Sequence, residues 1–250
     1  MTLKKLIRDS GNPITSRHEK WLRENPSPEY SEKAIKFAER VFRQEVGGSR
    51  NRNTKFRGSS VEKCERAQMF RAIGMEETPF DDSKTSNIFA TGNSLHLKWQ
   101  MAGLTEGWLE DAEVAVELPE LELGGTLDGI LYDGSGFEFK TVNNRGYAMA
   151  ESTGKPQKGH ISQVQTYMMM TDIEKFSIVY ENKDNQEWRE FVIPRDEEEI
   201  TDIRGRIFNL YHDFKEKRLP KVKRTCLDED GWEYRNCPYR DRCLGIKSWP

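Results

Sequence analysis

Two neighbouring segments near the middle of the chain carry acidic and basic side chains at a spacing suited to hydrolytic chemistry. They lie in the stretch GGTLDGILYDGSGFEFKT, which begins at Gly124. In an extended strand, side chains two residues apart share a face, so Glu138 and Lys140 point the same way. Asp128 lies in the preceding segment, and it joins them if the two segments pair as a hairpin of suitable register.

The turn between these segments decides on which face Asp128 lies. A two-residue loop at 134–135 would direct it away from the other two polar groups. A three-residue loop at 134–136 would bring all three to one face, and this loop favours a left-handed residue at its last position. Gly136 adopts that conformation at little cost. Turn chemistry therefore favours the convergent arrangement.

Two carboxylates and a lysine on a half-buried sheet face are costly without a partner. A divalent cation removes that cost, and carboxylate oxygens are ligands suited to Mg²⁺ or Mn²⁺. Such an ion lowers the pKa of a bound water and neutralises charge on a reacting phosphate, while Lys140 can hold or help deprotonate the attacking water. The alternative is a surface ion pair on an exposed sheet face, because Glu-x-Lys alone is a common pattern.

The elements that must position these residues are read from hydrophobic periodicity. Spacings of three and four predict helices, and alternation predicts strands. Expected helices cover 31–44, 60–73, a segment from about 86, 157–170 and about 200–219; expected strands cover 113–118, 121–132, 137–142, 175–180 and 188–193. This order predicts an α/β fold in which helices flank a mixed central β-sheet.

Composition and charge limit the class of protein. The 250 residues carry a formal net charge of -3, which argues against a general nucleic-acid coat but permits local basic tracks. No apolar run approaches the roughly 20 residues of a membrane helix, and no secretory signal is recognisable, so we expect a cytoplasmic protein. The candidates for DNA contact are basic residues of the early part of the chain: Arg50, Arg52, Lys55, Arg57 and Arg66.

Four cysteines form a second candidate site. Cys64 lies far upstream, and Cys226, Cys237 and Cys243 cluster near the C-terminus. In a cytosolic chain this distribution favours metal ligation over disulfides. Four thiolates suit an iron–sulfur cluster or a structural Zn²⁺, and unrelated thiols are the remaining alternative.

The pattern Gly-Gly-x-x-Asp followed by Glu-x-Lys resembles the PD-(D/E)XK nuclease superfamily. Gln163 and Tyr167 match the Gln-x-x-x-Tyr motif of its RecB-like branch, and His96, in TGNSLHLKW, matches the upstream histidine of that branch. The resemblance implies a restriction-endonuclease-like core over 59–220, preceded by a helical extension or cap over 1–58. It also implies a set of metal ligands and supporting groups: His96, Asp128, Glu138 and the backbone carbonyl of Phe139 at the metal, Lys140 at the nucleophile, and Gln163 with Tyr167 supporting the site or the strand.

The cysteine order resembles the iron–sulfur nucleases, namely CRISPR-associated RecB-like exonucleases and helicase–nuclease subunits of recombinational repair. That resemblance implies a 4Fe–4S cluster joining Cys64 to the segment 221–250, although the ten residues between Cys226 and Cys237 depart from the usual gap of two. It further implies a DNA exonuclease of recombination or repair, with a recombinase or helicase as partner. Two alternatives stay open: a non-catalytic zinc-containing nucleic-acid-binding protein, and a structural subunit that keeps the nuclease fold.

Overall fold

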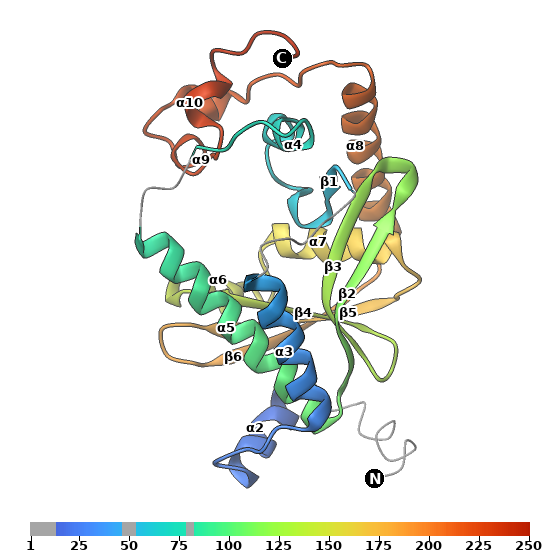
Figure 1. The fold of residues 1–250 in the computed structure, drawn as a ribbon, viewed down its shortest axis with the longest axis vertical. Helices are drawn as coiled ribbons and strands as arrows, with labels where there is room; N and C mark the ends of the chain where they lie inside the picture. Colours follow the sequence, from blue (N-terminus) through green and yellow to red (C-terminus); the bar gives the residue numbers. More distant parts are fainter. Residues whose placement is uncertain (1–13, 47–53, 79–82) are drawn as a thin grey trace.

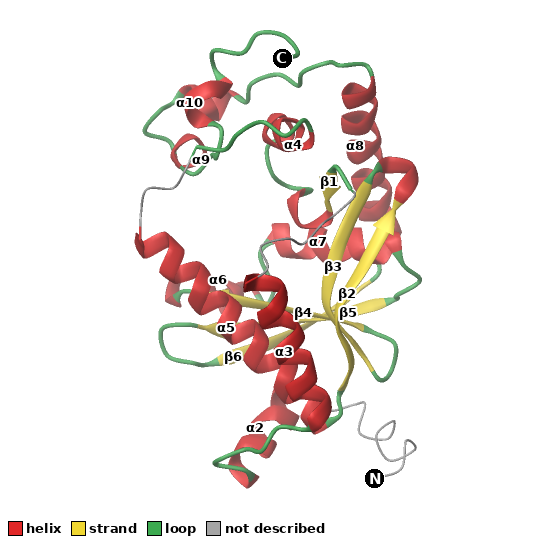
Figure 2. Cartoon of the chain, viewed as in Figure 1, coloured by secondary structure: helices red, strands yellow, loops and turns green. Residues whose placement is uncertain are grey.

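The computed structural model describes residues 14–46, 54–78 and 83–250. It is an α/β fold with a mixed six-stranded sheet and helices on both faces (Figures 1 and 2). The strands are β1 (Phe56–Arg57), β2 (Leu109–Leu118), β3 (Leu123–Leu131), β4 (Gly136–Val142), β5 (Lys175–Asn182) and β6 (Trp188–Pro194). The longer helices are α2 (Ile14–Glu24), α3 (Glu32–Val46), α4 (Glu65–Ala72), α5 (Ser83–Glu106), α6 (Asn144–Thr153), α7 (Lys158–Met170) and α8 (Glu197–Lys215). The C-terminal segment carries η3 (Arg224–Leu227), α9 (Trp232–Arg235) and α10 (Arg240–Cys243).

The sheet is mixed because its central strands are connected in two ways. β3 pairs antiparallel with β2 and β4 and parallel with the short β1. β4 pairs parallel with β5, and β5 pairs antiparallel with β6. A parallel pair needs a crossover rather than a tight turn, and α6 with α7 provides it. The crossover lays α7 across the face of β4 that carries the polar residues.

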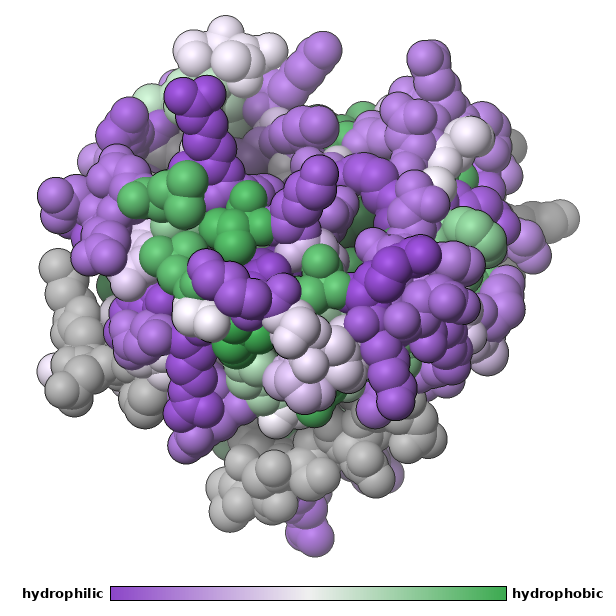
Figure 3. Space-filling view, turned by 90° about the horizontal axis from the view of Figure 1, so that it is seen from above, coloured by the Kyte–Doolittle hydropathy of each residue, from purple (hydrophilic) through white to green (hydrophobic). Residues whose placement is uncertain are grey.

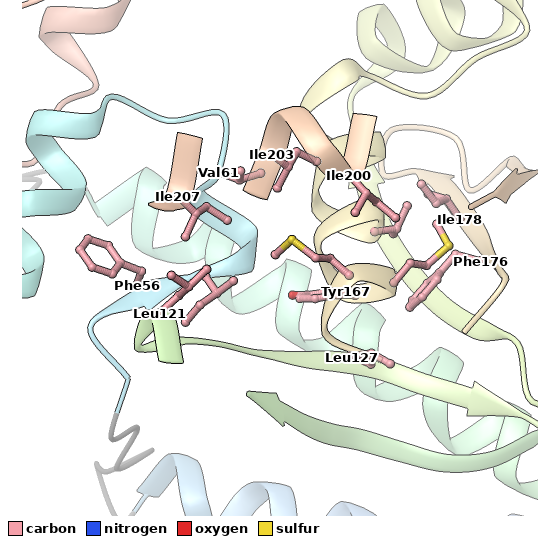
Figure 4. Packing of buried hydrophobic residues seen from close by; sticks show 14 of the residues in the cluster. Phe56, Val61, Leu121, Leu127, Tyr167, Phe176, Ile178, Ile200, Ile203 and Ile207 are labelled. Atoms are coloured by element: carbon pink, nitrogen blue, oxygen red, sulfur yellow. The ribbon is translucent and has the colours of Figure 1, made fainter. Parts of the chain in front are cut away.

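Alternation along the strands gives the sheet two cores. On one face, Tyr167 of α7 packs with Phe176 and Ile178 of β5 and with the isoleucines of α8 (Figure 4). On the other face, Phe137 and Phe139 pack with the residues of α5 and α3 around a fully buried tryptophan. Both rings of β4 therefore lie on the α5 face, as their alternation with Glu138 and Lys140 predicts.

The predicted strands and most predicted helices are confirmed within a few residues at their ends. The helix expected over 60–73 is shorter, because η1 (Gly58–Ser60) precedes α4, and it ends before Gly74, whose φ is 74°. The helix α6 was not expected. Its N-cap is Asn143, whose side chain accepts from the Gly146 N–H, and it ends at Gly154 with φ 65°.

The hairpin between β3 and β4 corrects the predicted turn. A three-residue loop closed by a left-handed glycine is present, but it spans 132–134 rather than 134–136, and the residue with positive φ is Gly134 at 80°. Asp133 fixes the turn because its Oδ1 accepts from the Ser135 N–H at 3.0 Å. Gly136 serves packing instead, since a Cβ there would lie 2.2 Å from Cζ of Phe176. The loop is displaced along the chain by an even number of residues, so the polar side chains still point to the predicted face of the sheet.

The end of the molecule that carries α9, α10 and the C-terminus is largely hydrophilic, with one gathered group of hydrophobic side chains (Figure 3). One exposed apolar residue of this segment is Leu227. None of the described helices is both long and apolar enough to cross a bilayer.

Candidate active site

The pairing of β3 with β4 brings the two carboxylates together. Gly129 pairs with Phe137, so the next step along the ladder sets Asp128 opposite Glu138. Asp128, Glu138 and Lys140 therefore share the face covered by α7. His96 reaches this group from α5, with its Nδ1 3.4 Å from Asp128 Oδ2.

Glu138 is the most buried member of the group, with only 1% of its side chain exposed. Its Oε1 accepts from Lys140 Nζ at 2.6 Å and from Gln163 Nε2 at 2.7 Å. Its Oε2 is buried and has no hydrogen-bond partner among the residues that the structure describes. A buried carboxylate oxygen left in this way destabilises the ionised form unless a cation lies beside it.

Asp128 is held from both its side chain and its backbone. Its Oδ2 accepts from the Phe139 N–H at 2.7 Å, and its carbonyl accepts from Gln100 Nε2 at 2.9 Å. Gln100 also donates to Glu113 Oε1 at 3.1 Å, so this buried amide links α5 to both β2 and β3. Gln100 was not expected as a site residue, although it lies four residues after His96 and hence on the same helical face.

The surroundings of the two carboxyl groups shift their pKa values in opposite directions. Burial, followed by repulsion from Asp128, raises the pKa of Glu138 from the usual 4.5 to about 7. Burial would also raise the pKa of Asp128, but the charge and hydrogen bond of His96, together with Lys140, hold it below its usual value. Burial opposes the charge of Lys140, yet the two carboxylates raise its pKa. The pair therefore favours one negative charge over two near neutral pH in the absence of a cation.

The Gln163–Tyr167 pair of α7 lies next to Glu138. Gln163 Nε2 lies 3.0 Å from the Tyr167 hydroxyl as well as donating to Glu138, so the amide connects the carboxylate to the buried phenol. The ring packs directly on two glycine backbones: a Cβ would lie 2.5 Å from Tyr167 Cε1 at Gly125 and 2.9 Å at Gly58. Gly125, the second glycine of the Gly-Gly pair before Asp128, thus leaves room for the tyrosine together with Gly58.

Basic side chains gather beside Lys140. The pKa of Lys63 is lowered, first by partial burial of its ammonium and then by repulsion from Arg71, Lys140 and Arg57. The residue as a whole stays exposed. A local cluster of cations near a reaction centre attracts phosphate despite the negative net charge.

The residues expected to contact DNA divide into three groups. Arg50 and Arg52 lie outside the described residues, and Lys55 and Arg57 are exposed on the segment around β1. Arg66 requires a correction, because it is buried with 5% exposure. Its guanidinium donates to the carbonyls of Pro220 at 2.7 Å, of Cys243 at 3.2 Å and of Ile246. These contacts make Arg66 an anchor for the C-terminal segment rather than a phosphate contact.

All four cysteines line one pocket between α4 and the C-terminal segment, together with apolar and aromatic neighbours that include Phe70 and Tyr239. The four thiols are free and half-buried. Burial of the Cys226 thiol raises its pKa, and repulsion from neighbouring groups, Cys64 first among them, raises it further. Within the described ranges, no three His, Cys, Asp or Glu side chains are already arranged to hold a metal ion, here or at Asp128. The pocket thus brings the thiols together without the geometry of a closed ligand set.

Comparison with known proteins finds no matching family model and no similar curated protein. Solved structures are similar in fold. An alkaline exonuclease (LHK-Exo) from Laribacter hongkongensis matches with a TM-score of 0.51 and 17% identity, over 66% of this chain and 90% of that chain. Its complex with dAMP matches with a TM-score of 0.51 and 19% identity over the same shares. The crystal structure of SSO0001 matches with a TM-score of 0.50 and 20% identity, over 93% of this chain and 96% of that chain. The fold therefore resembles the folds of these solved structures, one of which is an alkaline exonuclease.

Proposed function

We propose that this chain is a Mg²⁺- or Mn²⁺-dependent DNA exonuclease that hydrolyses phosphodiester bonds in recombination or repair. The observation that carries the proposal is the buried, unpartnered Oε2 of Glu138 opposite Asp128 and beside Lys140. A carboxylate pair that resists full ionisation near neutral pH without an added cation is suited to a divalent metal. The similarity in fold to an alkaline exonuclease supports the same reaction class.

The residues present fit a hard divalent cation. Asp128 and Glu138 would hold it, with the Phe139 carbonyl and His96 as additional ligands. When bound, the cation supplies a Lewis acid that lowers the pKa of water and neutralises charge on the phosphate. Gln163 fixes the orientation of Glu138 through its 2.7 Å hydrogen bond, and the Tyr167 hydroxyl lies beside that amide.

Lys140 is positioned to act on the nucleophile. Its ammonium is held at 2.6 Å from Glu138 Oε1 and keeps its proton, because the two carboxylates raise its pKa. A protonated lysine beside the cation site would orient the attacking water and stabilise the negative charge that develops on the non-bridging oxygens of the phosphate. Lys63, with Arg71 and Arg57 near it, would attract the flanking phosphates of the strand.

The cysteine pocket is proposed to hold a 4Fe–4S cluster, with Zn²⁺ as the alternative. The ligands would be Cys64, Cys226, Cys237 and Cys243, and their apolar surroundings suit the low-dielectric shell of such a centre. Ligation would join α4 to the C-terminal segment across a long loop. By analogy with a covalent crosslink, this closure contributes about 5 kcal/mol through chain entropy. Iron and sulfide content, with the colour of anaerobically purified protein, distinguishes the cluster from zinc.

DNA is the proposed substrate, since an exonuclease of similar fold has been crystallised with dAMP. The experiment measures degradation of end-labelled single- and double-stranded DNA with Mg²⁺, with Mn²⁺ and with EDTA. Wild type should degrade DNA only with a metal, and Asp128→Asn and Lys140→Ala should be inactive. Lys20→Ala, which removes an exposed lysine of α2, is the matched control and should behave as wild type. Equal activity in wild type and Lys140→Ala, or none in wild type, would refute the proposal.

A further inference from the structure

His160 lies on the same stripe of α7 as Gln163 and Tyr167, because the three residues are spaced by three and four. Its Nδ1 lies 2.5 Å from the hydroxyl of Tyr180, and the two rings meet edge-on with centroids 5.4 Å apart. Tyr180 is fully buried on β5, where it pairs with Lys140 of the neighbouring strand. Paired residues of adjacent strands share a face, so the tyrosine lies next to the catalytic lysine.

The hydrogen bonds of the Tyr180 hydroxyl determine which ring nitrogen of His160 carries the proton. The hydroxyl oxygen accepts from the Gln157 N–H at 2.9 Å. Burial raises the pKa of Tyr180 to about 12, so the phenol keeps its own proton. That proton needs an acceptor, and His160 Nδ1 at 2.5 Å is the one in reach. The ring of His160 therefore carries its proton on Nε2.

His160 is neutral in this environment. Burial, followed by the charge of Lys140, lowers its pKa to about 3. A neutral imidazole cannot deliver a proton as a strong acid near pH 7, but it can donate a hydrogen bond from Nε2. The ring is half-buried rather than enclosed, and no acceptor for Nε2–H is recorded among the described residues. The donor is thus available to a ligand at the site.

We propose that His160 is a further catalytic residue that donates a hydrogen bond from Nε2 to a non-bridging oxygen of the phosphate held at Lys140. This inference rests on the proposed nuclease function. Tyr180 is the positioning residue, because its hydroxyl holds the histidine in the tautomer that donates. A fixed neutral donor at a site of developing negative charge stabilises the transition state without transferring a proton.

The test compares single-turnover cleavage by wild type, His160→Ala, His160→Gln and Tyr180→Phe. His160→Ala should lower the rate of the chemical step by about 100-fold, with DNA affinity nearly unchanged. His160→Gln restores an N–H donor of similar reach and should recover part of the rate, and Tyr180→Phe should show an intermediate loss. His212→Ala, which removes an exposed histidine of α8, is the matched control and should retain the wild-type rate.

Sulfur substitution separates contact with the phosphate from a structural role. Sulfur replaces each non-bridging oxygen of the scissile phosphate in turn. For one of the two diastereomers, this replacement should slow cleavage by wild type more than it slows cleavage by His160→Ala. Equal sulfur sensitivity of the two proteins at both diastereomers, or wild-type cleavage by His160→Ala, overturns this inference alone. Absence of DNA cleavage by wild type overturns the nuclease proposal and this inference together. Nitrogen NMR of the imidazole should report the proton on Nε2, and a proton on Nδ1 would also overturn it.

Discussion

Glu138→Gln should remove a pH dependence of folding stability that the metal-free wild type shows. Burial and Asp128 raise the pKa of Glu138 to about 7, whereas its usual value of 4.5 applies in the unfolded chain. Between these values the folded state keeps a proton that the unfolded state has lost. The resulting stabilisation is fully present below pH 4.5 and is lost as the pH rises through about 7.

The size of this effect follows from the two pKa values. The change from 4.5 to about 7 corresponds to about 3 kcal/mol of unfolding free energy between mildly acidic and mildly alkaline solution. Glutamine has the shape of glutamate and does not titrate, so Glu138→Gln should lack this slope. The absolute stability of the variant also reflects its altered contact with Lys140, and only the pH-dependent difference between the two proteins is predicted.

The assay is urea unfolding of both proteins in EDTA at several pH values from 5 to 8, with the cysteine site in the same state of loading. The difference in unfolding free energy should change by about 2–3 kcal/mol across this window, with wild type losing stability at high pH. Adding Mn²⁺ at about 100 times its Kd should stabilise wild type at pH 8 by about 2.7 kcal/mol and leave the variant nearly unchanged. A difference that stays constant with pH refutes the assigned state of Glu138.

Three further predictions concern the surroundings of the site. Gln163→Leu should reduce metal affinity or cleavage rate by about 10- to 100-fold, because Glu138 loses the hydrogen bond that orients it; titration with Mn²⁺ and single-turnover rates measure this. Gly125→Ala should cost about 1–3 kcal/mol in chemical unfolding, because the new methyl group meets the phenol ring packed on that backbone. Gly205→Ala is its control: nothing lies within 4 Å, so a helix-interior alanine should stabilise by up to about 1 kcal/mol. Cys226→Ser should lower iron or zinc content and the thermal midpoint, whereas unchanged metal content would exclude this thiol as a ligand.

The fold follows from the sequence where local periodicity and burial agree. In β4 the rings of Phe137 and Phe139 alternate with Glu138 and Lys140, and each set lies on the face that alternation predicts. The position of the hairpin loop did not follow. Gly134 and Gly136 are equally able to close it, and the loop that forms is the one in which Asp133 Oδ1 accepts from the Ser135 N–H, while Gly136 packs against the Phe176 ring of β5.

Distant site residues follow from the sequence where a motif names them, since His96 and Gln163 lie against Asp128 and Glu138, but polar contacts without a motif do not follow. Arg66 was expected on the DNA because it is basic, yet its hydrogen-bond acceptors lie 154 to 180 residues away. The hydrogen bond of His160 to Tyr180 joins a helix to a strand 20 residues apart. No local pattern indicates such a pair, because both residues satisfy ordinary helix and strand preferences. Long-range polar contacts of this kind appear only once the sheet register is known.

The most direct test of the central claim is product analysis with linear and covalently closed circular DNA under Mn²⁺. An exonuclease with the site described here should release mononucleotides from linear DNA and leave closed circles intact. Lys140→Ala and wild type in EDTA should release none. Internal cuts in the circles, or mononucleotide release that persists in Lys140→Ala, would contradict an end-directed reaction at Asp128, Glu138 and Lys140.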